Sequence, residues 1–270
     1  MDRRGVLVLM LVAAAAAALP ACGGGGSSDS GGPAVITSKG VEYAYDMPST
    51  VPGGLTRIDY VNAGSQYHEW ALAKIEPGHT AADVRAYLDK HGPNGPPPPW
   101  VKDVGGVGVM SPGQQIGITR DLKQGHYAFI CFLPGPGGKP HYKLGMFKGF
   151  TVTGDSGAKP PKVDGAITAN DSGFTVGFLQ PGEQTIELRN DAKTPFGFNL
   201  FEQKPGHSLT ELRAFFKSGD LSKQAPALLL GGVQSIPPGQ SYYLNIDIQP
   251  GRQYLVIDPE KNAFKVFSAK

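Results

Sequence analysis

The chain has 270 residues, a formal net charge of +2, two cysteines, 38 glycines and 24 prolines. This length suits one large domain or two ordinary ones, and the glycine and proline content suits many turns between short strands. The small net charge and the scattered Lys and Arg residues exclude a basic nucleic-acid-binding surface. Two cysteines are too few for a disulfide-rich scaffold or a multi-cysteine zinc module.

The N-terminal segment predicts export from the cytoplasm. Two arginines precede an apolar run from Val6 to Leu19, which is too short to span a bilayer comfortably. Residues 1–22 resemble a bacterial lipoprotein signal, which implies cleavage before Cys22 and lipidation of that residue. Residues 23–34 predict a flexible Gly/Ser tether. We therefore expect an extracytoplasmic protein held at the cell membrane by its N-terminal lipid; a cleaved secretory signal with a soluble periplasmic or secreted product is the alternative.

An internal repeat organises the rest of the chain. The stretch from Asn62 matches the stretch from Asn190 at an offset of 128 residues, and both contain Pro-Gly-His before an amphipathic segment. The matches at an offset of 126 residues are Gly105-Gly106-Val107 with Gly231-Gly232-Val233 and Pro112-Gly113-Gln114 with Pro238-Gly239-Gln240. The repeat predicts a duplicated domain over 35–153 and 166–270, joined by a polar, Pro-rich linker at 154–165.

The local patterns predict strands with one helix in each half. Short runs rich in β-branched and aromatic residues, separated by Pro-Gly turns, are typical of sandwich strands. Strands are expected at 55–61, 115–119, 127–132 and 147–152. Capping boxes at Thr80 and Ser208 predict helices that end near Gly92 and Gly219. The expected fold class is all-β, with two β-sandwich domains that each carry one short helical insertion.

One set of residues has the chemistry of a metal site. Cys131, His141 and Met146 lie in one strand–loop–strand unit, and His68 begins an apolar run that a sandwich can bring beside this loop. Two imidazoles and a thiolate with a weak axial thioether are the ligands of an electron-transfer copper site. Each residue alone has an ordinary explanation, since a buried Cys acts as a small hydrophobe and a Met fills a core. The combination is what indicates copper.

Residues 125–152 resemble the copper-ligand hairpin of plastocyanin and other cupredoxins. The shared positions are Gly125, Tyr127, Cys131, Pro140, His141, Gly145, Met146 and Val152. The resemblance implies a Greek-key β-sandwich that holds one type 1 copper. The ligands it implies are His68, Cys131, His141 and Met146. It also implies that His141 is the port through which electrons leave.

Two features of the first half differ from plastocyanin. Nine residues separate Cys131 from His141, which makes a longer loop. Glu69 follows the first histidine, where plastocyanin and azurin have an Asn that ties the ligand loops together. An ionised Glu cannot donate that hydrogen bond, so we expect a different set of bonds to hold the loops.

The second half lacks the ligands. In the repeat alignment His68 falls on Phe196 and Cys131 falls on Asp258, and the loop that carries the other two ligands is missing. We therefore expect the second domain to be a degenerate, metal-free copy of the first.

Copper catalysis is not expected, and the chain is predicted not to be an enzyme. Copper nitrite reductases and laccase-type oxidases need a His beside the copper-binding Cys, but Cys131 lies between Ile130 and Phe132. The binuclear copper domain of cytochrome oxidase needs two cysteines in one loop. A Gly-x-Ser-x-Gly hydrolase motif is also absent from the sequence.

The sequence therefore predicts a blue-copper protein that transfers single electrons to or from an unidentified redox partner protein. Two alternatives stay open. One is a metal-free cupredoxin-like pair that acts as a cell-surface binding or scaffold protein, with Cys131 buried and inert. The other is a protein that captures or delivers copper.

Overall fold

The computed structural model describes residues 31–218, 220 and 223–269. The expected signal and lipidation site at Cys22 lie outside these residues, as does most of the expected tether. Among the described helices, none combines the length and apolar character needed to cross a membrane.

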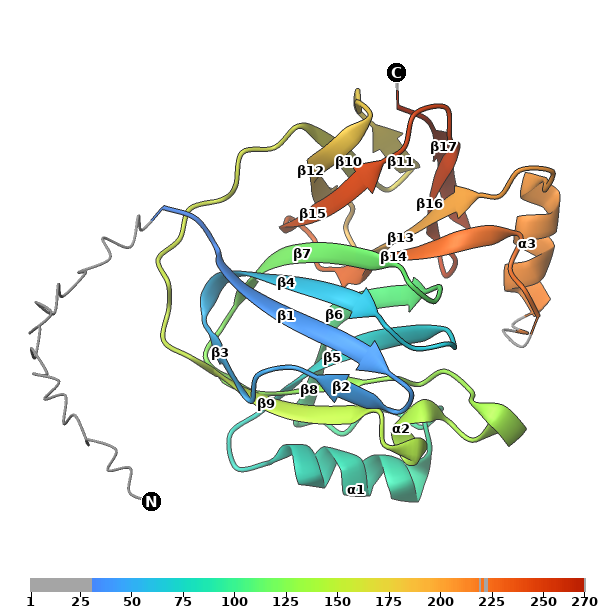
Figure 1. Ribbon diagram of the computed structural model, residues 1–270. Helices are drawn as coiled ribbons and strands as arrows, with labels where there is room; N and C mark the ends of the chain where they lie inside the picture. The colour runs from blue at the N-terminus through green and yellow to red at the C-terminus, as the bar shows by residue number, and fades with distance from the viewer. Residues whose placement is uncertain (1–30, 219, 221–222, 270) are drawn as a thin grey trace, which may run out of the picture. The chain divides into compact units, whose positions relative to one another are not determined.

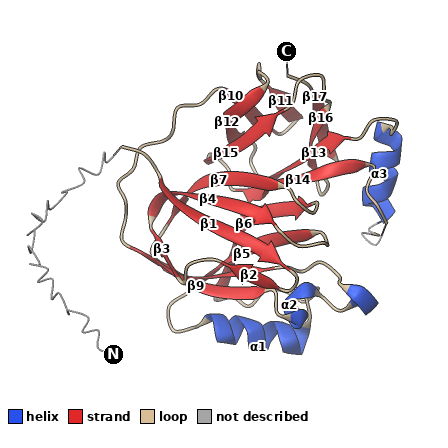
Figure 2. Ribbon diagram, viewed as in Figure 1, coloured by secondary structure: helices blue, strands red, loops and turns tan. Residues whose placement is uncertain are grey.

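The described chain is mostly β-structure (Figure 2). The strands of the first half are β1 (Ala34–Val41), β2 (Ala44–Asp46), β3 (Thr50–Pro52), β4 (Gly54–Asn62), β5 (His68–Ile75), β6 (Val101–Met110), β7 (Gln115–Leu122), β8 (Gly125–Ile130) and β9 (Phe147–Thr153). Those of the second half are β10 (Gly165–Asn170), β11 (Gly173–Val176), β12 (Gly182–Asn190), β13 (Phe196–Gln203), β14 (Ala227–Ile236), β15 (Ser241–Ile248), β16 (Tyr254–Asp258) and β17 (Ala263–Phe267). The helices are α1 (Ala81–His91), the 3-10 turn η1 (Pro136–Gly138), α2 (His141–Leu144) and α3 (Leu209–Ser218).

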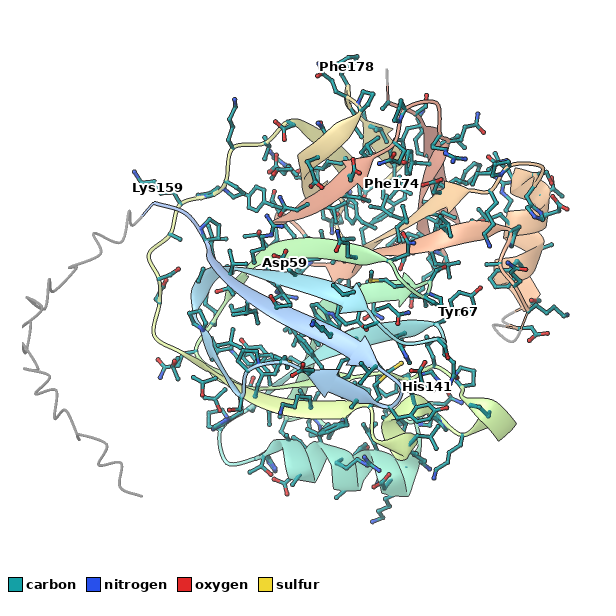
Figure 3. The ribbon with its side chains drawn as sticks, viewed as in Figure 1. Asp59, Tyr67, His141, Lys159, Phe174 and Phe178 are labelled. Atoms are coloured by element: carbon teal, nitrogen blue, oxygen red, sulfur yellow. The ribbon has the colours of Figure 1, made fainter. Side chains whose placement is uncertain are left out.

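Two mixed sheets run through both halves (Figure 1). One has the order β11-β10-β12-β15-β7-β4-β1-β2, and the other has the order β17-β16-β13-β14-β6-β5-β8-β9-β3. Aromatic contacts join the two sheets face to face. Tyr60 of β4 meets Trp70 of β5 edge-on at 6.2 Å between ring centroids. Phe174 of β11, labelled in Figure 3, meets Phe198 of β13 at 5.3 Å between ring centroids. The expected fold class, all-β with two sandwich halves, is confirmed.

The sequence patterns explain the burial of the strands. In β4 every second residue is buried, as expected for a strand with one face on the core. Strand β5 is buried along most of its length, because α1 covers this end of the sheet through contacts with the adjacent strand β8 and with β9 beyond it. Val84 of α1 belongs to one buried cluster with Ala128 and Tyr142.

The expected helix starts are also seen. Thr80 and Asp83 form both bonds of a capping box at α1, and the helix ends at Gly92, whose φ is 74°. At α3 the Ser208 hydroxyl accepts the Glu211 N–H at 3.2 Å. The first half also contains η1 and α2, which the sequence did not predict; α2 is a single turn whose side chains belong to the ligand loop.

The two halves meet through equivalent strands. Ile118 of β7 pairs with Leu244 of β15, and Val107 of β6 pairs with Val233 of β14. In both pairs the partners are repeat equivalents at the 126-residue offset. Antiparallel pairing of each strand with its own copy is the pattern of a pseudo-two-fold axis. Residues 154–164 between the halves contain no helix or strand; the exact domain limits stay a prediction.

Candidate metal centre

The fold brings the predicted ligands to one end of the nine-stranded sheet. His68 is the first residue of β5, and Cys131 follows the last residue of β8. These two strands are paired, with Ala71 opposite Ile130. His141 opens α2, and its N–H donates to the Leu133 carbonyl at 2.8 Å. Neighbouring strands and one short turn therefore place residues that are distant in sequence side by side, as the sequence predicted for His68.

Three ligand atoms converge. The Nδ1 atoms of His68 and His141 are 3.2 Å apart, and the Cys131 Sγ lies 3.4 Å from the His141 Nδ1. One candidate ligand atom from each residue lies within 4.8 Å of the others. Two nitrogens that bind one metal at about 2 Å each lie within about 4 Å of each other. The spacing of these side chains therefore fits a single metal ion.

The two imidazoles are held neutral. His68 is 0% exposed and His141 is 1% exposed. Burial lowers the pKa of His68 to about 4; repulsion between the two rings if both were protonated acts in the same direction, and Glu42 acts against it. Burial likewise lowers the pKa of His141. Near neutral pH both rings therefore keep a lone pair for a metal. The Nε2 atoms of both rings are buried without a hydrogen-bond partner in the part of the chain that the structure describes.

Cys131 is a buried thiol without a disulfide. Burial, with a smaller contribution from the nearby Glu69 carboxyl, raises its pKa to about 12. Hydrogen bonds from the backbone of Glu69 and Leu133 and from the Tyr45 hydroxyl act in the opposite direction. Metal binding would therefore have to displace a proton from this sulfur.

The burial of the Cys131 thiol predicts how fast it reacts in the metal-free protein. Because only the thiolate reacts and Cys131 is both buried and protonated, we expect its reaction with a disulfide reagent to be slow in the folded chain. Denaturant should restore the rate of an ordinary cysteine. Thiol titration with and without denaturant measures this, with Cys22→Ser as the background so that Cys131 alone is observed. Equal rates in the two conditions would contradict the buried position.

Met146 lies beside the three residues. Its N–H donates to the His141 carbonyl at 2.9 Å, and its carbonyl accepts the Cys131 N–H at 3.2 Å. Its side chain is fully buried in the same core cluster as Cys131. Gly145 precedes it at φ 130°, and a Cβ there would lie 2.7 Å from the Tyr43 carbonyl oxygen. Only glycine therefore allows this turn into β9.

Glu69 joins the ligand strand to the ligand loop. Its side chain is buried and its Oε1 accepts the Phe132 N–H at 3.3 Å, so the bond between the two segments uses Glu69 as an acceptor, in line with the expectation that a different set of bonds holds the loops. Its Oε2 accepts from the Gln234 amide of the second half at 2.9 Å. Burial raises the pKa of Glu69 to about 7, while these two hydrogen bonds lower it. The Tyr45 hydroxyl donates to the Glu69 backbone carbonyl.

Sequence reasoning missed the residues that surround the ligands. Tyr43 packs edge-on against His141 at 5.2 Å between ring centroids. The Tyr45 hydroxyl contacts the Cys131 sulfur. Gly64 approaches His68 so closely that a Cβ would lie 2.6 Å from its Nε2. Local sequence patterns carry no signal for these contacts, because each depends on how loops meet in space.

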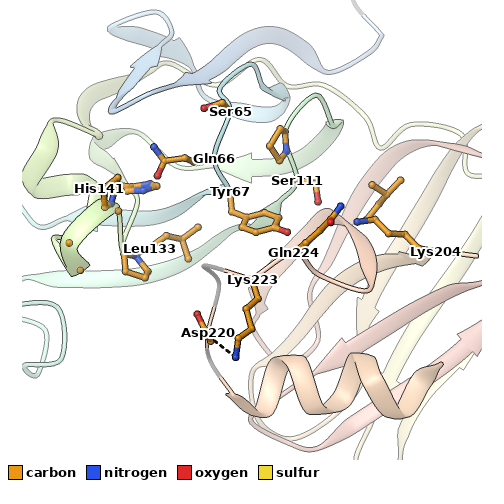
Figure 4. Close-up of a pocket in the computed structure, with 17 residues that line it drawn as sticks. Ser65, Gln66, Tyr67, Ser111, Leu133, His141, Lys204, Asp220, Lys223 and Gln224 are labelled. Carbon is orange, nitrogen blue, oxygen red and sulfur yellow. Dashed lines mark ion pairs between the residues drawn. The ribbon is translucent and has the colours of Figure 1, made fainter. Parts of the chain in front are cut away.

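A cavity of about 910 Å³ opens beside His141 (Figure 4). The first half contributes Tyr67, Leu133 and His141 to its walls, and the second half contributes Lys204 and others. The His141 side of the site therefore lies next to open space between the halves.

The second half has the same strands without the ligands. Asn199 pairs with Ile257 as Ala71 pairs with Ile130, so Asp258, the last residue of β16, occupies the position that Cys131 has directly after β8. Phe196 begins β13 as His68 begins β5. Among the described residues, the structure has one group of His, Cys or acidic side chains spaced for a metal, the one in the first half.

Comparisons with known proteins give only distant similarities. A scan of protein-family models finds no match, and a search of curated proteins finds none. The chain is similar to an auracyanin from the photosynthetic bacterium Roseiflexus castenholzii, with 23% identity over 46% of this chain and 100% of that chain and a TM-score of 0.30. It is similar to auracyanin A, a "blue" copper protein from Chloroflexus aurantiacus, with 24% identity over 45% and 100% of the two chains and a TM-score of 0.32. A multicopper oxidase matches with 16% identity over 87% and 88% and a TM-score of 0.25. These identities and TM-scores are low, so we take no functional property from them.

Proposed function

We propose that the chain is a blue-copper protein that transfers single electrons. The observation that carries the proposal is the convergence of two buried, neutral imidazoles and one buried thiol at 3.2 and 3.4 Å. Two His and one Cys with a nearby Met are typical of type 1 copper and unlike the oxygen ligands that hard cations prefer. Copper bound there would supply a one-electron couple between Cu(II) and Cu(I).

The residues of the chain have separate roles in this proposal. His68 and His141 would bind through the nitrogens that face each other, Cys131 through its sulfur, and Met146 as the weak axial ligand. These residues are buried and backbone hydrogen bonds join His141, Met146 and Cys131, an arrangement that suits electron transfer because a site held in one geometry rearranges little between oxidation states. The His141 side faces the cavity, which gives a partner protein an approach to the site.

Export and anchoring are part of the same proposal. Lipidation of Cys22 would hold the folded body at the outer side of the cell membrane, where a redox partner protein would meet it. We propose no catalytic role. The support for these statements is the sequence, since Cys22 lies outside the described residues.

A visible absorption spectrum tests the function. On addition of Cu(II), the purified protein is expected to develop an intense thiolate-to-copper band that reversible reduction bleaches. Cys131→Ser should lose this band completely, since the band needs the sulfur. Cys22→Ser, which removes the other cysteine, is the matched control and should keep it.

Other outcomes would favour other functions. A chain that shows no band and no change on Cys131→Ser would be a metal-free scaffold or binding protein. A band that disappears as copper passes quickly to a mild chelator would favour copper capture or delivery. The Cys22→Ser variant also tests anchoring, because it should leave the membrane fraction.

A further inference from the structure

The carboxyl group of Glu69 is a buried link between the ligand residues. It follows His68 directly, and its Oε1 accepts the N–H of Phe132, the residue after Cys131. The link therefore ties the start of β5 to the end of β8 at the position of two proposed ligands. A buried carboxyl group needs donors on both oxygens to offset the loss of water.

The second donor comes from the other half of the chain. Gln234 of β14 donates its amide N–H to the Glu69 Oε2 at 2.9 Å. It follows Val233, which pairs with Val107 at the pseudo-two-fold axis. The pairing of β14 with β6 thus lets a side chain of the second half cross the boundary between the halves and contact Glu69 on β5.

The repeat shows that the two partners of this bond occur together. The pseudo-two-fold axis relates Glu69 to Gly197 and Gln234 to Gly108. The strand registers support these equivalences, since Phe198 faces Val233 as Trp70 faces Val107. The ligand side of the axis therefore has both side chains, one from each half, and the equivalent side has glycine at both positions.

The contacts differ on the two sides of the axis. The Gly197 N–H donates to Asp258 at 2.8 Å, so a different bond joins the equivalent strands where no ligands are present. The Glu69–Gln234 bond is thus a feature of the ligand side alone, although the backbone around both positions is repeated. If this bond served only to join the two halves, an equivalent bond would be expected on both sides of the axis and not on the ligand side alone.

We propose that Gln234 is a positioning residue of the copper site, supplied by the second half. The proposal rests on the proposed function of the first half. Gln234 fixes the Glu69 carboxyl group, and Glu69 fixes the backbone that presents His68 and Cys131. The metal-free domain thereby holds the geometry of a metal site to which it contributes no ligand. Residues that orient ligands in this way typically change metal affinity about 10- to 100-fold when they are removed.

The first test replaces Gln234 by Leu, which has a similar size and no donor. Copper affinity is expected to fall about 10- to 100-fold, and the reduction potential and the thiolate-to-copper band should shift. In the metal-free protein, the Phe132 amide should exchange with solvent faster, because its acceptor is no longer held. This last measurement needs no copper.

A matched control removes a different buried bond between the halves. The Arg120 guanidinium donates to the Tyr242 hydroxyl at 2.8 Å, away from the ligands. Tyr242→Phe should lower the unfolding free energy by a similar amount and leave the copper band, the potential and the Phe132 exchange rate unchanged. An effect of Gln234→Leu on stability alone would match this control and would overturn the proposal.

A swap of the two side chains separates positioning from simple loss of packing. Gln234→Glu sets two carboxyl groups against each other and should disturb the band as Gln234→Leu does. In the double variant Glu69→Gln, Gln234→Glu, the amide at position 69 can accept from Phe132 and donate to the new carboxylate, so the parental band should return. Failure of the double variant to restore the band would count against the proposal.

The two proposals fail in different ways. If the parent protein shows no thiolate-to-copper band, the copper function is wrong, and the positioning role falls with it even if the Phe132 exchange rate changes. If the parent has the band and Gln234→Leu keeps its parental affinity, spectrum and potential, the function stands and the role of Gln234 is wrong.

Discussion

Replacing His68 by Phe, the residue that the second half has at the equivalent position, is expected to abolish the type 1 copper site while the fold remains. One of the two imidazole ligands is lost, and the phenyl ring offers no lone pair. Loss of a direct ligand should exceed the effect of a residue that only orients ligands, so copper affinity is expected to fall more than about 100-fold. The intense band should disappear. Copper titration followed by absorption and equilibrium dialysis measures both.

The repeat explains why the variant should still fold. Phe196 is buried at the start of β13, so the same backbone accepts a phenyl ring there. His126→Phe is the control, since His126 is an exposed histidine on β8 and should keep the copper band. A His68→Phe protein with the parental band and affinity would remove His68 from the ligand set and leave the proposed function without its main support.

The sequence predicted those parts of the site that local patterns encode. Alternating apolar residues and Pro-Gly turns mark the strands, and Thr80 and Ser208 mark the helix starts, because these signals act within a few residues. The order of Cys131, His141 and Met146 identifies the ligand loop, since its ends are fixed by two neighbouring strands.

The parts that were missed depend on contacts over long sequence distances. Helix α2 was not predicted because its single turn is too short to show a periodic pattern. Tyr43 reaches His141 from a separate loop, and Gln234 reaches Glu69 across the boundary between the halves. The repeat alignment did contain a signal for Gln234: its equivalent is glycine, and so is the equivalent of Glu69.

Replacing Gly232 by Ala is expected to destabilise the whole folded chain. Gly232 has φ 84°, a conformation that costs an L-residue about 1–2 kcal/mol. A Cβ there would overlap the Phe198 carbonyl oxygen and lie 3.0 Å from the Leu200 amide nitrogen. Backbone cannot move aside as a flexible side chain can, so we expect a total loss of about 3–5 kcal/mol of unfolding free energy. Denaturant unfolding measures this loss.

Gly239→Ala is the matched control because Gly239 has φ 71° and a Cβ there meets nothing within 4 Å. It should therefore cost only the conformational part, about 1–2 kcal/mol. The difference between the two variants isolates the close approach of β14 to β13. Equal losses would mean that the strands are not packed this tightly. Since Gln234 lies two residues beyond Gly232 on the same strand, a displaced β14 should also weaken its bond to Glu69, and the Gly232→Ala protein that does fold should bind copper less tightly than the Gly239→Ala protein.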